Sequence, residues 1–162
     1  MPAQVVTPKV GRDPVVDAVL SASRVLVAVA ARSLGDVAEE VTLTQYRTLV
    51  VLASRGPQSL AALAEAIDVT PPTATRMCDR LIRKGLVQRR HERGDRRLIR
   101  LSLSEKGQVL VHEVTERRRA EITGLLKAIP REQQTALVDS LQRLSAAAGE
   151  VPEQDWSAGW DL

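Results

Sequence analysis

The chain has 162 residues and a net charge of +3, and its length fits one domain, or one domain with appended helices, rather than two independent cores. A single cysteine and two histidines exclude an internal disulfide framework, CxxC motifs and most metal cages, so we expect no metal site. The longest uninterrupted apolar run, residues 25–31, is far shorter than the roughly 18 to 20 residues that cross a bilayer, and the N-terminus lacks the pattern of a secretory signal, so we expect a cytoplasmic protein with no membrane partner.

The first half of the chain shows helical periodicity in three segments. A long helix is predicted over residues 13–34, apolar over much of its circumference, with Pro14 in its first turn. A second helix is predicted over residues 44–54 with Thr44 as N-cap, and a short third one over residues 60–67 with Ser59 as N-cap.

A fourth helix and a hairpin follow directly. Thr70 before Pro71 predicts a helix start, and Gly85 closes the helix after Lys84. One face of this helix is apolar and the other is cationic. Residues 86–91 and 98–103 then alternate like two strands, joined by the basic tip ERGDRR at 92–97.

The last third of the chain is helical up to an acidic tail. A long helix is predicted from Ser104 to about residue 129, and a final helix after Pro130. Within the long helix, the run 117–119 of three arginines is interpreted as a solvated face, with pairing to acids across a dimer as the alternative.

Basic residues are concentrated in one segment. Residues 76–100 hold ten arginines and lysines against three acids, a net charge of +7, whereas the rest of the chain is net acidic. A concentrated basic block of this kind is typical of duplex nucleic-acid binding. Single-strand binding is disfavoured, because residues 1–155 offer only Tyr46, which we expect in the core, as an aromatic surface on which bases could stack.

Two short helices, a tight link, a helix with a cationic face and a basic hairpin follow the order of a winged helix-turn-helix. The helix 71–84 can enter the major groove and present side chains to base edges. A guanidinium on the hairpin can enter the minor groove of the same duplex. The order predicts a protein that binds double-stranded DNA.

The sequence resembles the MarR-type winged-helix transcription regulators over about residues 13–147. The resemblance rests on LTQYRTLVVLA at 43–53, on LAALAEAIDVTPPTATRMCDRLIRKGLV at 60–87, and on GDRRLIRLSLSEKG at 94–107, which fits the family's D-x-R-x-x-x-x-x-L-[ST] wing signature. It implies a mainly α fold with a small β-wing. Its expected parts are an N-terminal arm (1–12), dimerisation helices (13–40 and 105–149), a DNA-binding lobe (41–104) and a tail (150–162).

The resemblance also implies a function. It implies a homodimer that places two recognition helices on a palindromic operator and represses transcription. Repression in this family is often relieved by a small, frequently anionic or phenolic effector, bound between the dimerisation helices and the DNA-binding lobe.

Carried over to this sequence, the resemblance makes Arg97 the wing arginine of the minor groove and Asp95 the carboxylate that orients it. The alternative for Asp95 is a plain turn residue after Gly94. Arg93 and Arg96 are the other expected DNA-binding residues of the wing.

On the recognition helix, Thr73, Thr75 and Arg76 are the candidates that face bases, whereas Arg80 and Arg83 are expected on phosphates. For Arg76, a positioning contact is the equal alternative. Pro71 and Pro72 depart from the polar residues usual in the family and remove two hydrogen-bond donors from the start of the helix.

Two other classes of function are weighed against DNA binding. The chain has no Gly-rich phosphate loop, GxSxG or HExxH motif, so we expect neither an enzyme nor a cofactor. A helical protein-interaction module that kept the fold without binding DNA is the stronger alternative, and the +7 segment argues against it. Cys78 falls on the apolar face of the recognition helix, which favours a small core residue over a redox sensor.

The tail at 150–162 has four acids, no base and both tryptophans. Free tryptophans would leave large apolar areas wet, so we expect the tail to fold back on its own dimer. Trp156 and Trp160 are the expected anchors, and the acids expected near basic surface are Glu150, Glu153, Asp155 and Asp161. Docking over the basic groove and docking on the dimerisation helices both remain open.

Overall fold

The computed structural model describes residues 13–39, 41–92 and 95–156. Its elements are α1 (Pro14–Leu34), η1 (Gly35–Glu39), α2 (Leu43–Arg55), α3 (Leu60–Ala66), α4 (Pro71–Arg83), β1 (Val87–Glu92), β2 (Asp95–Leu103), α5 (Glu105–Leu126), α6 (Arg131–Ala147) and η2 (Glu153–Asp155). The predicted winged helix-turn-helix between flanking helices is confirmed.

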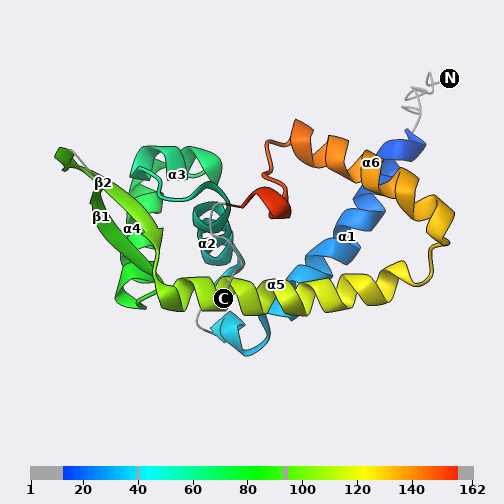
Figure 1. Cartoon of the computed structure of the whole chain (residues 1–162), viewed down its shortest axis with the longest axis horizontal. Coiled ribbons are helices and arrows are strands. Elements are labelled where there is room, and N and C mark those ends of the chain that lie inside the picture. The colour runs from blue at the N-terminus through cyan, green and yellow to red at the C-terminus, as the bar shows by residue number, and fades with distance from the viewer. Residues whose placement is uncertain (1–12, 40, 93–94, 157–162) are drawn as a thin grey trace, which may run out of the picture.

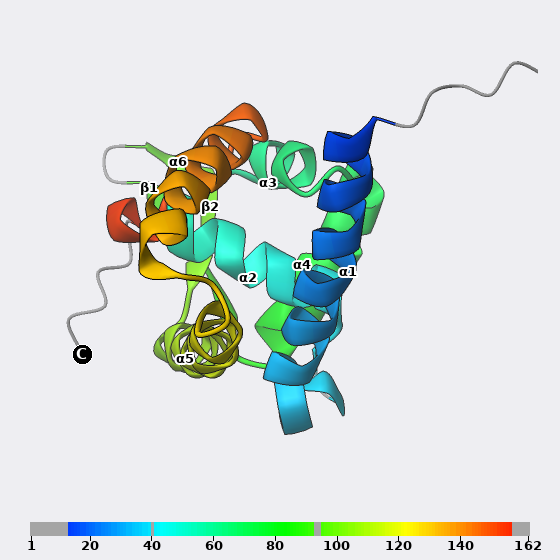
Figure 2. The ribbon, with the colours of Figure 1, turned by 90° about the vertical axis from the view of Figure 1, so that its right-hand side faces the viewer.

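The helix α5 runs along the long axis of the molecule (Figure 1). The lobe formed by α2, α3, α4, β1 and β2 lies at the N-terminal end of α5, and the hairpin forms the far tip of the lobe. The helices α1 and α6 overlap in Figure 1 but lie on different sides of the molecule in Figure 2. Of these two helices, α1 is the one that packs closely along α5 in the described part of the chain.

Local signals explain most of the helix boundaries. Ser59 caps α3 through a bond that its hydroxyl accepts from the Ala62 N–H at 3.2 Å, and Gly85 ends the turn after α4 with a φ of 72°. The predicted cap of α2 was wrong. Thr42 is the N-cap, in a capping box with Gln45, because the two side chains bond reciprocally to each other's backbone N–H.

Two other predicted boundaries also differ from the structure. The helix α5 ends at Leu126 rather than near residue 129. The strand β2 begins at Asp95, three residues before the predicted start, because the antiparallel ladder continues past the apolar alternation to pair Glu92 with Asp95.

An aliphatic core joins the lobe to α5. Leu49, Leu63 and Leu81, from α2, α3 and α4, are fully buried, and Val111 and Val114 of α5 close the same core. Burial of these side chains is the main favourable contribution to folding of the lobe. It also fixes which face of α4 turns outward.

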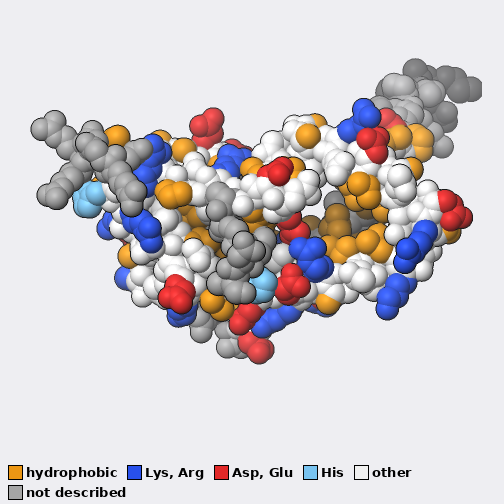
Figure 3. Space-filling view, in the orientation of Figure 1, with side chains coloured by type: hydrophobic (Ala, Val, Ile, Leu, Met, Phe, Trp, Pro, Cys, Tyr) orange, Lys and Arg blue, Asp and Glu red, His pale blue; other side chains and the backbone are white. Residues whose placement is uncertain are grey.

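Two flanking helices expose apolar side chains. In α1 these are Val15, Val16, Val19, Leu20, Val25, Leu26 and Val27, and in α6 they are Val138, Leu141 and Leu144. None of the α6 residues is buried by the described part of the chain. Hydrophobic side chains also line the hollow between these helices and α5 (Figure 3).

The expectation that no segment could span a membrane needs correction. By length and composition alone, the segment Pro14–Val37 is long and apolar enough to cross one, and it is mostly unburied in the chain. The length of the uninterrupted apolar run, residues 25–31, does not reveal this segment. Polar residues such as Ser21 and Arg24 interrupt the segment but lower the mean hydropathy only slightly. Core helices of soluble proteins and signal sequences satisfy the same criterion.

Candidate DNA-binding surface

The helix α4, the expected recognition helix, turns its cationic face outward because the opposite face is buried in the core. Ala74, Met77, Cys78 and Leu81 are buried, as the predicted apolar stripe requires. The Thr48 hydroxyl donates a hydrogen bond of 2.9 Å to the Met77 sulfur and so ties α4 to α2. The arginines on the outer face, at positions 76, 80 and 83, are exposed.

The hydroxyls at the start of α4 already have partners in the chain. The Thr75 Oγ1 donates to the Pro71 carbonyl at 2.9 Å, and the Oγ1 atoms of Thr70 and Thr73 share a hydrogen bond of 2.9 Å. With its proton donated to Pro71, the Thr75 hydroxyl can offer a ligand only an acceptor, beside its methyl group. Pro71 and Pro72 are exposed at the tip of the helix.

The base of the wing is held by a short third segment. Gln58 and Leu101 exchange two backbone hydrogen bonds, of 2.9 and 2.7 Å. The register of β1 and β2 shifts between His91 and Glu92, beside the tip. Asp95, Arg96 and Arg97 were predicted in the hairpin tip, but their backbone belongs to β2.

The side chains of Asp95, Arg96 and Arg97, together with residue Arg93 as a whole, lie outside the described residues. Their roles at DNA stay predictions.

An ion pair between Asp79 and Arg89 links the recognition helix to the wing. The Arg89 Nη2 lies 2.7 Å from the Asp79 Oδ1, and the Asp79 carbonyl accepts a bond from Arg83 Nε at 3.4 Å. This pair was not expected from the sequence. A signal was present, because Asp79 is the only acid in residues 76–91. Basic side chains gather over the wing end of the molecule in Figure 3.

Cys78 has the environment of a structural cysteine. It is 2% exposed, and burial, with the nearby Asp79 carboxylate, raises its pKa to about 11 against the opposing effect of Arg89. A thiol with this pKa is almost wholly protonated at neutral pH and reacts slowly. Within the described ranges, no cluster of three or more His, Cys, Asp or Glu residues could hold a metal ion.

A pocket of about 420 Å³ lies where α1, α2 and α5 meet, here called the junction pocket. Its lining residues are Ala30, Leu43, Thr44, Tyr46, Arg47, Val50, Ile67 and Arg118. Tyr46 is 2% exposed, and its hydroxyl lies 3.5 Å from the Thr115 hydroxyl. The core position expected for Tyr46 is confirmed, and the same residue also lines this pocket.

Arg118 gives the junction pocket a cation. Its guanidinium carbon lies 5.5 Å from the centre of the Tyr46 ring, and its buried Nε has no hydrogen-bond partner among the described residues. Burial raises the pKa of Tyr46, opposed by the Thr115 hydrogen bond and Arg118 and reinforced by Glu153, so the phenol stays neutral. The interpretation of the 117–119 run as a solvated face is wrong for Arg118, which turns toward α2.

The described part of the tail, residues 150–156, folds back on the chain against α2 and α5. Glu150 pairs with Arg47 of α2, Glu153 pairs with Arg119 of α5 at 3.0 Å, and Trp156 packs against the core. The predicted anchoring by Trp156, Glu150 and Glu153 is confirmed. Asp155 is exposed, and Trp160 and Asp161 lie outside the described residues.

Comparisons with known proteins agree on one family. The model of the MarR family matches residues 41–99. The HTH-type transcriptional repressor MdtR of Bacillus subtilis is 32% identical over 119 residues, which are 74% of this chain and 77% of MdtR. These relatives are transcription regulators and not enzymes.

Two solved structures are also similar. The crystal structure of RV1404 from Mycobacterium tuberculosis has a TM-score of 0.79 and 37% identity, and the match covers 88% of this chain and 99% of that one. NadR in complex with 4-hydroxyphenylacetate has a TM-score of 0.63 and 25% identity, with 90% and 98% of the two chains covered.

Proposed function

Because the chain belongs to the MarR family of transcription regulators, we propose that it is a cytoplasmic repressor that binds a palindromic operator as a homodimer. The observation that carries this proposal is the exposed cationic face of α4 beside a basic wing. Thr73, Thr75 and Arg76 face bases in the major groove, and Arg80 and Arg83 contact phosphates.

The wing extends the contact into the neighbouring minor groove. Arg97 enters it with Asp95 as its orienting carboxylate, and Arg93 and Arg96 add positive charge beside it. The ion pair between Asp79 and Arg89 supports this arrangement, since it adds a contact between the wing and the recognition helix.

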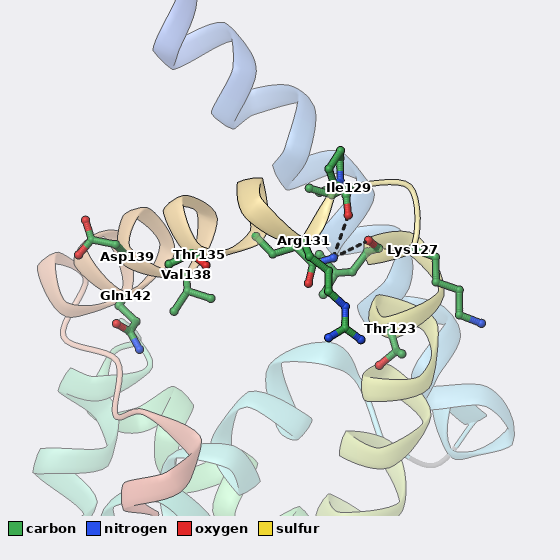
Figure 4. Close-up of a pocket in the computed structure, with 11 residues that line it drawn as sticks. Thr123, Lys127, Ile129, Arg131, Thr135, Val138, Asp139 and Gln142 are labelled. Carbon is green, nitrogen blue, oxygen red and sulfur yellow. Dashed lines mark hydrogen bonds between the residues drawn. The ribbon is translucent and has the colours of Figure 1, made fainter.

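A second copy of the chain covers the apolar faces of α1 and α6. The end of α5, the following loop and α6 frame a cleft of about 1090 Å³. Val138, Arg131 and Gln142 point into its open space in Figure 4. Two chains that insert their flanking helices into each other bury these surfaces and set two lobes about a two-fold axis. The lobe at 41–104 and the dimerisation helices at 13–40 and 105–149 are the parts of this arrangement.

A dimer interface explains the exposed face of α1 better than a membrane does. Arg32 donates two hydrogen bonds, of 3.0 and 2.8 Å, to one carboxylate oxygen of Glu121 on α5. This pair ties α1 into the protein, and Asp17, Arg24 and Arg32 along the helix would be costly in the hydrocarbon core of a bilayer.

The junction pocket is the proposed site of a small effector. Its apolar lining, the Tyr46 ring and the unpaired Nε of Arg118 suit an aromatic molecule that carries an anionic group. The phenolic acid bound by NadR supports this class of ligand. The pocket contacts both the lobe and α5, so a ligand there can bias their relative arrangement.

A selection of genomic DNA fragments by the purified chain tests the function. We expect enrichment of fragments that share a palindrome, weakened sharply by Arg97→Ala and unchanged by Arg143→Ala, a matched control on α6 whose side chain is 81% exposed and does not line the cleft. A chain that enriches no sequence would support the alternative, an interaction module that does not bind DNA.

The dimer is tested by light scattering of the purified chain without detergent. We expect the mass of two chains at micromolar concentration. A stable monomer would contradict both the dimer and the palindromic site, and a requirement for detergent would favour a membrane role for α1.

A further inference from the structure

Residues 149–156, here called the tail clamp, bridge two elements that meet at the junction pocket. The Gly149 carbonyl accepts a hydrogen bond of 3.1 Å from Arg55 of α2, and Glu150 bonds to Arg47 of the same helix. At the other end, Glu153 bonds to Arg119 of α5 at 3.0 Å. The tail clamp therefore holds the lobe helix α2 against the long helix α5.

An aromatic anchor completes the tail clamp. Trp156 is partly buried against the core cluster that contains Tyr46, and its indole N–H donates to the Val151 carbonyl at 3.1 Å. The indole ring therefore buries apolar area while its N–H keeps a hydrogen-bond partner.

Arg47 belongs to the junction pocket and to the tail clamp at the same time. It lines the pocket, and both of its terminal nitrogens bond to the Glu150 carboxylate, Nη1 to Oε2 at 3.0 Å and Nη2 to Oε1. Two parallel N–H···O bonds are the geometry with which arginine binds a carboxylate. The rim of the pocket is therefore a carboxylate site that already holds a carboxylate from the chain itself.

We propose that Glu150 is the resident occupant of a carboxylate-binding position at Arg47, and that a carboxylate ligand binds there by displacing Glu150 and releasing the tail clamp. The proposal rests on the proposed effector role of the junction pocket. It adds that the site selects a carboxylate group, and that Glu150 of the chain itself competes with the ligand for Arg47.

The strength of the contacts allows this exchange. The side chains of Arg47 and Glu150 are 38% and 41% exposed, and partly exposed ion pairs are weak and sensitive to salt. The competition is reciprocal. The docked tail clamp lowers the affinity for the ligand by some factor, and the bound ligand lowers the equilibrium constant for docking of the tail clamp by the same factor. Its release removes a tie between the lobe and α5.

The experiment measures the accessibility of Trp156 to acrylamide. A Trp160→Phe background makes Trp156 the single tryptophan. In this background, Glu150→Gln should raise the quenching of Trp156 at least twofold, whereas Asp155→Asn, which removes one charge from the same segment, should leave it unchanged. Far-UV circular dichroism checks that each variant is folded.

Potassium propionate is the ligand probe, because it carries the carboxylate of a glutamate side chain. At equal ionic strength, propionate should raise quenching relative to chloride, and neutral propionamide should not. Arg47→Gln should abolish the effect. In Glu150→Gln, the propionate affinity, followed by calorimetry, should rise about threefold, the effect expected for loss of a partly exposed ion pair.

Equal quenching in Glu150→Gln and Asp155→Asn, or equal quenching in propionate and chloride, would overturn the proposal. DNA binding by the same parent chain is measured separately. Failure to bind any DNA would contradict the proposed function while leaving the quenching result standing, and unchanged quenching in a chain that binds its operator would contradict only the tail clamp.

Discussion

Arg80→Ala should reduce the salt dependence of operator binding. Arg80 is exposed on the outer face of α4, in its last turn, where it is expected to contact a phosphate. Each neutralised phosphate adds about 0.9 to the slope of log K against log salt. With about eight phosphate contacts in a dimer, the parent slope is about −7, and loss of two symmetric contacts should bring it to about −5.

Arg76→Ala should act differently, because Arg76 lies one turn nearer the helix start and is expected at a base edge. A lost bidentate contact should remove about 1 to 3 kcal/mol of discrimination at one base pair in each half-site. Its salt slope should change less than that of Arg80→Ala.

Both variants are measured by fluorescence anisotropy on the selected operator, over a series of salt concentrations and with duplexes substituted at each position. Arg143→Ala, on α6, is the matched control. A slope for Arg80→Ala that parallels the parent would refute the phosphate contact. A uniform loss by Arg76→Ala on all duplexes would make that residue a positioning contact.

Three further predictions concern stability, reactivity and base readout. Gly107→Ala should destabilise the chain by about 1 to 3 kcal/mol in thermal melts, because the added Cβ would lie 2.1 Å from the Leu86 carbonyl oxygen. Gly124→Ala, with nothing within 4 Å, is the control and should stabilise by about 0.5 to 1 kcal/mol; equal melting temperatures would contradict the packing argument. Cys78, with a pKa of about 11, should react with iodoacetamide at pH 8 about 100-fold more slowly than a normal thiol, and a native rate equal to that in urea would refute this. We expect the exposed ring of Pro72 to contact a thymine methyl group, so replacing that thymine by uracil should weaken binding about fourfold in the parent but not in Pro72→Ser; equal sensitivity in both proteins would exclude this readout.

The lobe was predictable from sequence because its determinants are local. Helical spacing and caps placed α3 and α4 within one residue of their observed ends. The cap of α2 was misplaced although its signal was present, since Thr42 and Gln45 have the spacing of a capping box. Thr44 looked equally suitable as a hydroxyl before an apolar run, and only the reciprocal bond distinguishes the two.

The wing was predicted less well because its pairing is not local to either strand. Asp95, Arg96 and Arg97 show no apolar alternation, so nothing in their own pattern marks them as a strand. They join β2 because Glu92 opposes Asp95 across the ladder. Hairpin register is set by the turn and by the partner strand, and not by propensity alone.

The contacts of the tail could be expected in kind but not in detail. Four acids near a chain rich in arginine indicate that ion pairs will form, but charge alone does not select partners. Glu150 reaches Arg47 across 103 residues of sequence, and Glu153 meets Arg119 because α5 and α6 double back (Figure 1). Such pairs follow from tertiary arrangement, which a sequence pattern of short period does not encode.

The aromatic residues of the described chain lie at the junction of helices rather than in the middle of the lobe. Aliphatic side chains fill the lobe, whereas Tyr46 and Trp156 pack where α2, α5 and the tail meet. A ring with a polar group suits this place, since it buries a large area and still makes a directed hydrogen bond. Tyr46 bonds to Thr115 of α5, and Trp156 bonds within the tail clamp. A ligand in the proposed effector site would therefore contact Tyr46 beside the contacts that hold the lobe to α5, where its binding can bias how the lobe packs on that helix.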